Sequence, residues 1–156
     1  MRTACTLVAA LLGSLLLIAC PTMPLTVAPA DFAVYDTGEM RQAVSFDRVV
    51  YQVKRVANKP LADLAFWRVA IKEHFEKAGY IVTTDGAIDA AGKPGYYIES
   101  TEPRGTADYM YLVAVFIQDE NLIVVESAGE LAAYNARREK IFATIKATDL
   151  AGTGGR

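Results

Sequence analysis

Residues 109–127, YMYLVAVFIQDENLIVVES, hold two apolar runs separated by a short polar link. In the first run apolar side chains fill neighbouring as well as alternate positions, so a strand formed there is apolar on both faces. Such a strand is expected at the centre of a sheet, covered on both sides over part of its length. Asp119, Glu120 and Asn121 then predict a tight hairpin into the second run, LIVVES, and hence an antiparallel pair.

The segment after this pair has the pattern of an amphipathic helix. Ser127 and Glu130 have the S-x-x-E spacing of a capping box, in which side chains satisfy free N–H groups at a helix start. The apolar positions beyond it share one helical face: Leu131, Tyr134, Ile141, Phe142 and Ile145. We expect this face to pack on the sheet.

A second amphipathic helix is predicted upstream, in residues 61–79. Pro60 suits its first turn, where a missing N–H costs nothing, and Gly79 suits the position just past its end. The residues at spacings of three and four form a continuous apolar stripe: Leu64, Trp67, Ile71, Phe75 and Ala78.

The remaining segments predict further strands. Between residues 46 and 56, period-2 alternation puts Val49, Tyr51 and Val53 on one face of a strand. Shorter strands are expected at residues 32–35, 42–45, 80–84 and 96–100, with a turn at 37–39 and loops at 85–95 and 101–107. Adjacent strands with short turns, plus two helices that must each bury a stripe, predict an α+β domain with an antiparallel sheet over residues 32–150.

Two stretches resemble a known family in element order and hydrophobic texture. They are AFWRVAIKEHFEKAGYIV (65–82) and YLVAVFIQDENLIVVESAGELAAYNARREKIFATI (111–145). Together they look like the PsbP-like fold, which an extrinsic photosystem II subunit, a nuclear Ran-binding protein and several small bacterial envelope lipoproteins share. The resemblance implies a layered sandwich of sheet and helices over about residues 45–148, and a binding or assembly role rather than catalysis. It carries no binding residue across, because no functional motif matches.

The N-terminus has the order of a secretory signal. Arg2 precedes an apolar run of twelve residues from Leu7 to Ile18, whereas a permanent membrane span needs about 20. Residues 17–20, Leu-Ile-Ala-Cys, resemble the lipobox of bacterial lipoproteins. That resemblance implies cleavage after residue 19 and a diacylglycerol thioether on Cys20, so we expect a signal peptide at 1–19 and a lipid bilayer as one partner.

The residues next to Cys20 predict a tether. Three prolines and no charge occur in Pro21–Ala30, and such a linker spans about 3.1 Å per residue, or roughly 30 Å in all. The lipidated cysteine and tether are assigned to residues 20–31, and a disordered tail to 151–156. Cys5 lies in the signal, so the mature chain has no second thiol with which to form a disulfide.

Charge and motif content narrow the function classes. Removal of residues 1–19 takes away one charge, that of Arg2, and leaves 15 Lys and Arg against 18 Asp and Glu, a net charge of −3. No basic excess favours phosphate binding, so the sequence predicts no nucleic-acid partner. The single histidine, His74, is not accompanied by the further His or Cys residues that a metal site usually needs. No cofactor-binding motif occurs in the sequence. We therefore expect neither metal nor cofactor.

Glycosidases use a pair of Asp or Glu side chains to cleave the glycosidic bond, so paired carboxylates are the candidates for catalysis here. Six carboxylates of the expected domain are candidates to converge in space: Asp85, Asp89, Glu99, Glu102, Asp108 and Glu126. Their spacing matches no catalytic motif, so surface solvation explains them better and no catalytic residue is predicted. Glu126 stands apart because it interrupts an apolar strand and there calls for a basic partner.

A recognition surface is the remaining candidate site. Four tyrosines cluster on neighbouring predicted strands, with Arg104 in the loop between them: Tyr96, Tyr97, Tyr109 and Tyr111. Tyrosine and arginine are enriched where proteins bind one another. Sheet packing explains the tyrosines equally well, so these residues are weak candidates for a binding patch.

The expected function is that of a non-catalytic envelope lipoprotein, anchored to a membrane outside the cytoplasm. It would bind another envelope protein or assist assembly of a membrane complex through one sheet face and the loops at 85–95 and 101–107. One alternative is a lipid-anchored cell-wall hydrolase with Asp89, Glu99 or Glu126 as acid and base. Another is a carrier of small apolar ligands, which needs a cavity lined by residues such as Phe66, Tyr109 and Phe116.

Overall fold

The computed structural model describes residues 28–36, 41–104 and 107–150, which form seven strands and two helices. The α+β class expected from the sequence is confirmed. In chain order the elements are β1 (Phe32–Asp36), β2 (Arg41–Ser45), β3 (Val50–Ala57), α1 (Leu64–Lys77), β4 (Ile81–Ala90), β5 (Lys93–Arg104), β6 (Ala107–Gln118), β7 (Asn121–Glu130) and α2 (Leu131–Ala147). The expected signal peptide, Cys20, nearly all of the tether, the turn at 37–39 and the tail lie outside the described residues.

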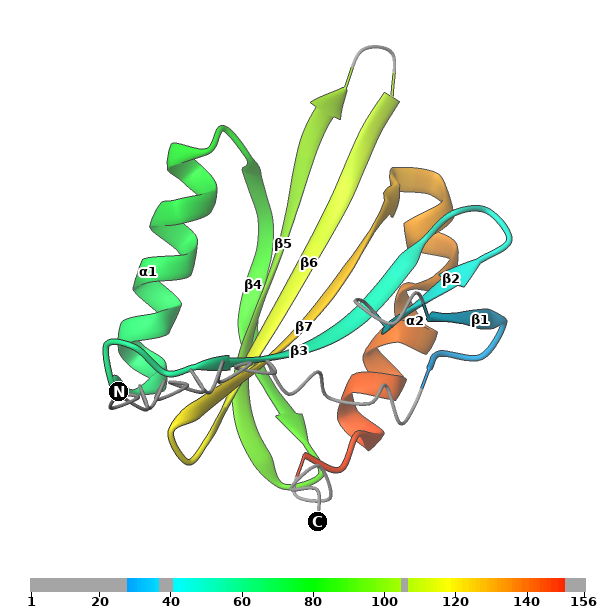
Figure 1. Cartoon of the computed structure of the whole chain (residues 1–156). Helices are drawn as coiled ribbons and strands as arrows, with labels where there is room; N and C mark the ends of the chain where they lie inside the picture. Colours follow the sequence, from blue (N-terminus) through cyan, green and yellow to red (C-terminus); the bar gives the residue numbers. More distant parts are fainter. Residues whose placement is uncertain (1–27, 37–40, 105–106, 151–156) are drawn as a thin grey trace, which may run out of the picture.

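The strands form one antiparallel sheet in the order β1-β2-β3-β7-β6-β5-β4. Strands that follow one another in the chain are also neighbours in the sheet, with one exception. Between β3 and β4 the chain forms α1, and β3 pairs instead with β7 from the far end of the chain. In this pairing Tyr51 lies opposite Ser127. The last strand is thereby placed at the centre of the sheet, with β6 beside it (Figure 1).

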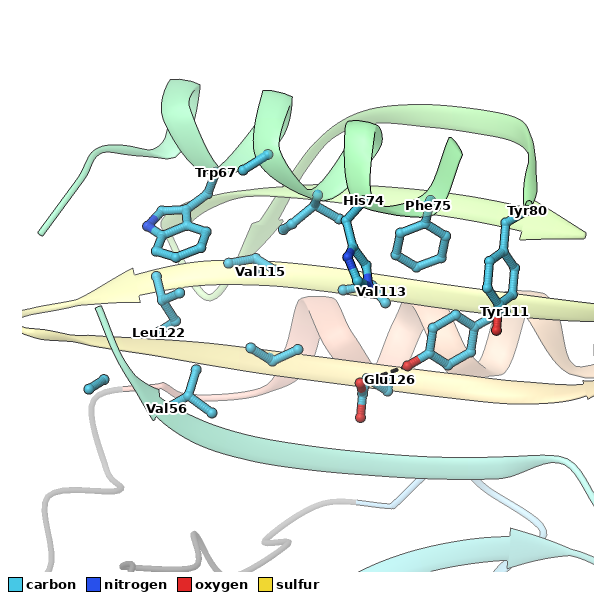
Figure 2. Close-up of a pocket in the computed structure, with 14 residues that line it drawn as sticks. Val56, Trp67, His74, Phe75, Tyr80, Tyr111, Val113, Val115, Leu122 and Glu126 are labelled. Atoms are coloured by element: carbon cyan, nitrogen blue, oxygen red, sulfur yellow. Dashed lines mark hydrogen bonds between the residues drawn. The ribbon is translucent and has the colours of Figure 1, made fainter. Parts of the chain in front are cut away.

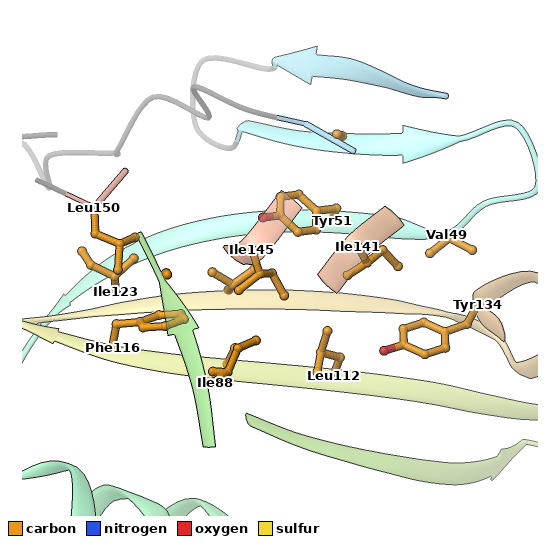
Figure 3. Close-up of a cluster of buried hydrophobic side chains, with 14 of the residues drawn as sticks. Val49, Tyr51, Ile88, Leu112, Phe116, Ile123, Tyr134, Ile141, Ile145 and Leu150 are labelled. Carbon is orange, nitrogen blue, oxygen red and sulfur yellow. The ribbon is translucent and has the colours of Figure 1, made fainter. Parts of the chain in front are cut away.

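Each helix covers one face of the sheet, so the domain has three layers (Figure 1). On the α2 face a large apolar cluster includes Leu112 and Phe116 of β6 with Ile141 and Ile145 of α2 (Figure 3). On the α1 face a smaller cluster joins Val113 and its neighbours to the stripe of α1. Because successive side chains of a strand point to opposite faces, β6 supplies both clusters. The expectation of a strand covered on both sides is confirmed.

The loop expected at residues 85–95 is wrong, because β4 and β5 form a long hairpin there. The chain turns at Ala91 and Gly92, both with positive φ (49° and 85°). Gly86 and Gly95 lie within the strands, at positions where a larger side chain would meet an aromatic ring. A Cβ on Gly86 would lie 3.2 Å from the ring of Tyr97, and one on Gly95 would run into the ring of Phe116. The small residues thus make room for aromatic rings across the sheet.

Three further boundaries differ from expectation. The loop expected at 101–107 is mostly strand, since β5 runs to Arg104 and β6 starts at Ala107. Phe46–Arg48 forms a turn, so β3 begins only at Val50, although Val49, Tyr51 and Val53 do share the α2 face. Strand β7 continues to Glu130, and α2 follows it directly.

Both expected helix starts are also wrong, whereas both apolar stripes are confirmed except at Ala78, which is the exposed C-cap of α1. Ser127 caps no helix: its hydroxyl donates to the carbonyl of Val50 at 2.8 Å and ties β7 to β3. Helix α1 begins after Asp63, whose carboxylate accepts from the N–H of Phe66 at 2.9 Å, so Pro60 lies before the helix. Gly79 follows the C-cap with a φ of 86°, as expected. None of the helices in the described residues is both long and apolar enough to cross a membrane.

Candidate functional site

An open groove of about 620 Å³ lies between α1 and the sheet (Figure 2). We call it the α1 groove. Residues of α1, β3, β6 and β7 and of the turn after α1 line it: Val56, Ala57, Trp67, Ala70, Ile71, His74, Phe75, Tyr80, Tyr111, Val113, Val115, Leu122, Val124 and Glu126. Its volume falls in the range of about 300–1,000 Å³ that is typical of ligand pockets.

The groove exists because α1 lies toward one edge of the sheet. The helix packs mainly on β4 and β5, and β7 and β3 remain largely uncovered on the same face (Figure 1). At its first turn Trp67 Nε1 donates to the buried Asn58 Oδ1 at 2.7 Å. Farther along, Asp85 of β4 lies 3.7 Å from both Arg68 and Lys72. The Asp85 contacts tie the helix to the outer strand β4, whereas the Trp67 bond ties its first turn to the end of β3.

The floor of the groove is apolar. Val113 and Val115 of β6 and Leu122 of β7 point toward α1 (Figure 2). Val124 of β7 also lines the groove, and Val56 at the rim is 42% exposed. Most of this floor is already buried, since Val113, Val115 and Leu122 are 7%, 2% and 4% exposed, and the apolar surface that stays open lies at Val124 and Val56. The arrangement therefore suits binding of an apolar group.

A polar cluster around Glu126 closes one part of this floor. Its Oε1 accepts from the hydroxyl of Tyr111 at 2.7 Å, and its Oε2 accepts from Gln52 Nε2 at 2.6 Å and pairs with Lys54 Nζ at 2.5 Å. Burial, and then this hydrogen bond, raise the pKa of Tyr111, so its hydroxyl stays a donor. The basic partner expected for Glu126 is thus Lys54.

A second, smaller cavity of about 310 Å³ adjoins the α1 groove and shares Tyr80 and Tyr111 with it. We call it the Tyr80 pocket; its other lining residues are Glu102, Tyr109, Met110 and Ala128. The ring of Tyr111 lies 5.5 Å from that of Phe75 and 6.0 Å from that of Tyr80. Aromatic rings therefore form the boundary between the two cavities.

The three carboxylates named for acid–base catalysis lie in three separate places. Glu99, 2% exposed, is under α2, where Tyr134 and Arg138 donate to it. Glu126 is on the opposite face of the sheet. Asp89 is exposed and accepts from the N–H of Gly92 in the β4–β5 turn. No two of these three form a catalytic pair.

The other acidic candidates do not gather either. Asp85 accepts from the hydroxyl of Tyr96 at 2.8 Å, and this bond, with the nearby Lys72 and Arg68, lowers its pKa. Glu102 lines the Tyr80 pocket. Asp108, near the start of β6, is exposed.

The candidate binding tyrosines divide between the two faces of the sheet. Tyr96 is 4% exposed in the α1-face cluster, and Tyr97 packs edge-on against Phe142 under α2. Tyr109 is 40% exposed and lines the Tyr80 pocket. The side chain of Arg104 lies outside the described residues. Of the predicted patch, Tyr109 and Tyr111 line the Tyr80 pocket, and the binding role of these residues stays a prediction.

The cavity residues expected for an apolar ligand were mostly wrong. Phe116 is fully buried on the α2 face and Phe66 is 45% exposed outside the groove, whereas Tyr109 does line the smaller cavity. His74 is an exposed residue of α1 that borders the groove. Among the described residues no group of His, Cys, Asp and Glu could hold a metal ion.

The sequence matches no protein-family model and no curated protein, but solved structures share the fold. A Pseudomonas aeruginosa protein of unknown function, PA94, superposes with a TM-score of 0.58 at 12% identity, covering 77% of this chain and 97% of that one. PsbP (CyanoP) from Synechocystis sp. PCC 6803 superposes with a TM-score of 0.52 at 14% identity. The match covers 76% of this chain and 80% of that one.

LpqN of Mycobacterium tuberculosis, a protein involved in cell envelope biogenesis, superposes with a TM-score of 0.55 at 8% identity. The match covers 77% of this chain and 78% of LpqN. Likeness at such low identity carries the fold and not the function. The PsbP-like fold implied by the sequence resemblance is therefore confirmed.

Proposed function

We propose that this protein is a non-catalytic binding protein of the bacterial cell envelope, and that its α1 groove holds an apolar segment of a partner protein. The observation that carries the proposal is the groove itself, about 620 Å³ of open space over an apolar floor. Contiguous apolar surface with a polar rim marks interaction sites on soluble domains. A partner segment that covers this floor removes it from water.

The envelope location rests on the N-terminal sequence. The apolar run and the Leu-Ile-Ala-Cys segment at residues 17–20 support export and attachment of acyl chains to Cys20. LpqN, which has the same fold, is involved in cell envelope biogenesis, and this supports the same compartment here. A tethered domain with an open groove suits the capture of a neighbouring envelope protein.

The proposal is tested by photo-crosslinking in the full-length chain expressed in its native host. A photoreactive amino acid replaces Val124 on the groove floor or, as a control, Ala136 on the exposed side of α2. We expect a discrete polypeptide adduct from position 124 and none from position 136. In the same chain Ala70→Phe fills the groove and should abolish the adduct.

The matched control is Ala65→Phe, on the exposed side of the same helix. It introduces the same ring outside the groove and should leave the adduct intact. If Ala70→Phe unfolds the domain, Val56→Arg at the half-exposed rim blocks the groove instead. An adduct that survives both groove variants, or the lack of any adduct at position 124, overturns the proposal.

The groove volume also favours a second candidate, a carrier of a small apolar ligand. Native mass spectrometry of protein purified from its host distinguishes the two. A carrier retains a ligand of constant small mass that Ala70→Phe displaces. A protein-binding domain is recovered without such a ligand.

A further inference from the structure

Phe46, in the turn between β2 and β3, is 87% exposed and is the most exposed large apolar side chain of the described residues. The neighbouring edge strand β1 adds Val34, 56% exposed, and Tyr35, 57% exposed. We call these three residues the Phe46 corner. A second group of exposed apolar side chains lies on and around α1: Leu61, Phe66, Val69 and Ile81. The domain thus has two exposed apolar surfaces outside its cavities.

The Phe46 corner is distinguished by where the N-terminal chain enters the domain. Phe32, the first residue of β1, lies opposite Ser45 in the sheet, and Ser45 directly precedes Phe46. From Cys20 to Ala28 an extended Pro-rich chain spans about 25 Å. An anchor at Cys20 therefore keeps this corner of the domain close to the bilayer. A short tether raises the effective concentration of such a contact to the millimolar range, so a contact too weak to bind a free domain still forms.

The turn presents the Phe46 ring in a defined position. The carbonyl of Ser45 accepts from the N–H of Arg48 at 3.0 Å, and its Oγ accepts from the N–H of Val49 at 2.9 Å. The guanidinium of Arg137 on α2 lies over the ring, 4.7 Å from its centroid, and pairs with Asp47. Little further ordering of this ring is needed when it meets a partner, which lowers the cost of binding.

The charges around the corner are balanced. Two ion pairs flank it, Asp47–Arg137 and Asp31–Lys140. Arg48 precedes β3 and Glu130 ends β7, so these two exposed groups of opposite sign lie at the same end of this strand pair. The corner therefore offers an apolar contact rather than an ionic one. Apolar side chains of this kind are buried at the boundary between lipid headgroups and acyl chains.

We propose that the Phe46 corner docks on the lipid bilayer that holds the acyl chains of Cys20, with the Phe46 ring among the headgroups. This inference rests on the acylation of Cys20 in the proposed function and adds an orientation to it. The sheet edge at β1 then faces the membrane. Helix α1 packs on β4 and β5 toward the opposite edge (Figure 1), so its groove stays clear of the bilayer and open to a protein partner.

Docking is tested with the mature chain, residues 20–156, whose single thiol at Cys20 is coupled to a maleimide lipid in phosphatidylcholine vesicles. The phosphatidylcholine carries bromine near its headgroup, which quenches tryptophan on contact. Phe46→Trp places a reporter at the corner, and Phe66→Trp makes the same change on the rival surface of α1. We expect the emission added at position 46 to lose most of its intensity. The emission added at position 66, like that of the native Trp67, should be kept, and high salt should change neither result.

A second reporter tests whether the Phe46 ring itself makes the contact. Val34→Trp, on the neighbouring strand β1, should also be quenched by the brominated vesicles. Adding Phe46→Ser should restore its emission, whereas adding Phe66→Ser, the matched control, should leave it quenched. Thermal unfolding of each variant establishes that the domain is folded.

The outcomes separate this inference from the proposed function. Reporters at positions 46 and 34 that stay unquenched in a chain that sediments with the vesicles overturn the docking and leave the α1 groove as proposed. Stronger quenching at position 66 than at position 46 assigns the membrane contact to α1 and likewise overturns it. Unmodified Cys20 in protein from its host removes the anchor, and this inference with it, while crosslinking at position 124 still decides the groove.

Discussion

Glu99, a candidate acid in the hydrolase alternative, links a strand to a helix through its carboxylate. Its carboxylate is 2% exposed, and it accepts from the hydroxyl of Tyr134 at 2.7 Å and from two nitrogens of Arg138 at 2.8 and 2.7 Å. Bidentate pairing of this kind fixes geometry as well as charge. Burial and the nearby carboxylate raise the pKa of Tyr134, so the hydroxyl remains a donor. The group holds α2 to β5.

We expect either half of this pair to be costly to remove alone. Arg138→Met leaves a buried carboxylate without its cation, and Glu99→Leu leaves Tyr134 without an acceptor. A broken buried pair costs about 3–5 kcal/mol; because Arg138 is 41% exposed and screened by solvent, about 2–3 kcal/mol is expected for each variant. Urea unfolding followed by circular dichroism measures the loss.

The double variant Glu99→Leu with Arg138→Met should recover part of that loss, because it leaves no unpaired charge. Lys77→Met provides the control. It breaks the exposed Glu73–Lys77 pair and should leave the unfolding midpoint unchanged. Additive single losses in the double variant would contradict a coupled buried pair.

At the scale of the elements, periodicity predicted the helices well and the strand limits poorly. The stripe of α1 is visible in the sequence because only burial of one helical face requires apolar residues every three or four positions. Gly86 and Gly95 led to the wrong prediction of a loop at residues 85–95, because a glycine in a strand and a glycine in a loop cannot be told apart in the sequence. Only the strand register shows that aromatic rings cover them. Ser127 was wrongly predicted to cap a helix, since its hydroxyl donates instead to the carbonyl of Val50, 77 residues away.

Asp85 adds a polar link between helix α1 and β4, and its contribution to stability depends on pH. The hydrogen bond from Tyr96, with Lys72 and Arg68, holds the pKa of Asp85 below its ordinary value of 3.8. A carboxyl group whose folded pKa is lowered contributes stability above its unfolded pKa and loses it as the pH falls through the folded pKa. The contribution of Asp85 is therefore complete at neutral pH and disappears below about pH 4.

Asp85→Asn should be less stable than the wild type at neutral pH, and the difference should shrink as the pH falls below about 4. Urea unfolding at a series of pH values measures it. Tyr96→Phe removes the main cause of the lowered pKa and should give a smaller pH-dependent difference of the same sign. A constant difference between Asp85→Asn and the wild type at all pH values would contradict this role.

At the scale of the whole molecule, the groove could not be predicted from the sequence. Its lining comes from residues as far apart in the chain as Val56 and Glu126, and it depends on how far α1 lies toward one edge of the sheet. Local patterns fix which face of a helix is buried, but not where on the sheet the helix rests. Glu126 was the one sequence signal, as a carboxylate inside an apolar strand.

The anchor proposed at Cys20 would determine where this groove operates. Ala28 packs against the α2-face cluster, on the opposite side of the sheet from the α1 groove. Eight positions separate Cys20 from Ala28, and an extended Pro-rich chain of that length spans about 25 Å. A domain held on such a tether can turn the groove toward proteins beside the membrane.

Lipidation of Cys20 is the property on which the envelope assignment depends. One acyl chain gives marginal membrane binding, whereas two or more, at about 0.8 kcal/mol per buried CH₂, hold a domain stably. We therefore expect the protein to sediment with membranes, resist high salt and dissolve in detergent. Cys20→Ser removes the thiolate that is alkylated, so its N-terminal peptide should lack acyl mass while the domain unfolds at the same temperature. Mass spectrometry that finds Cys20 unmodified in the wild type, or a mature chain that begins elsewhere, would refute the anchor and leave the groove to be tested by itself.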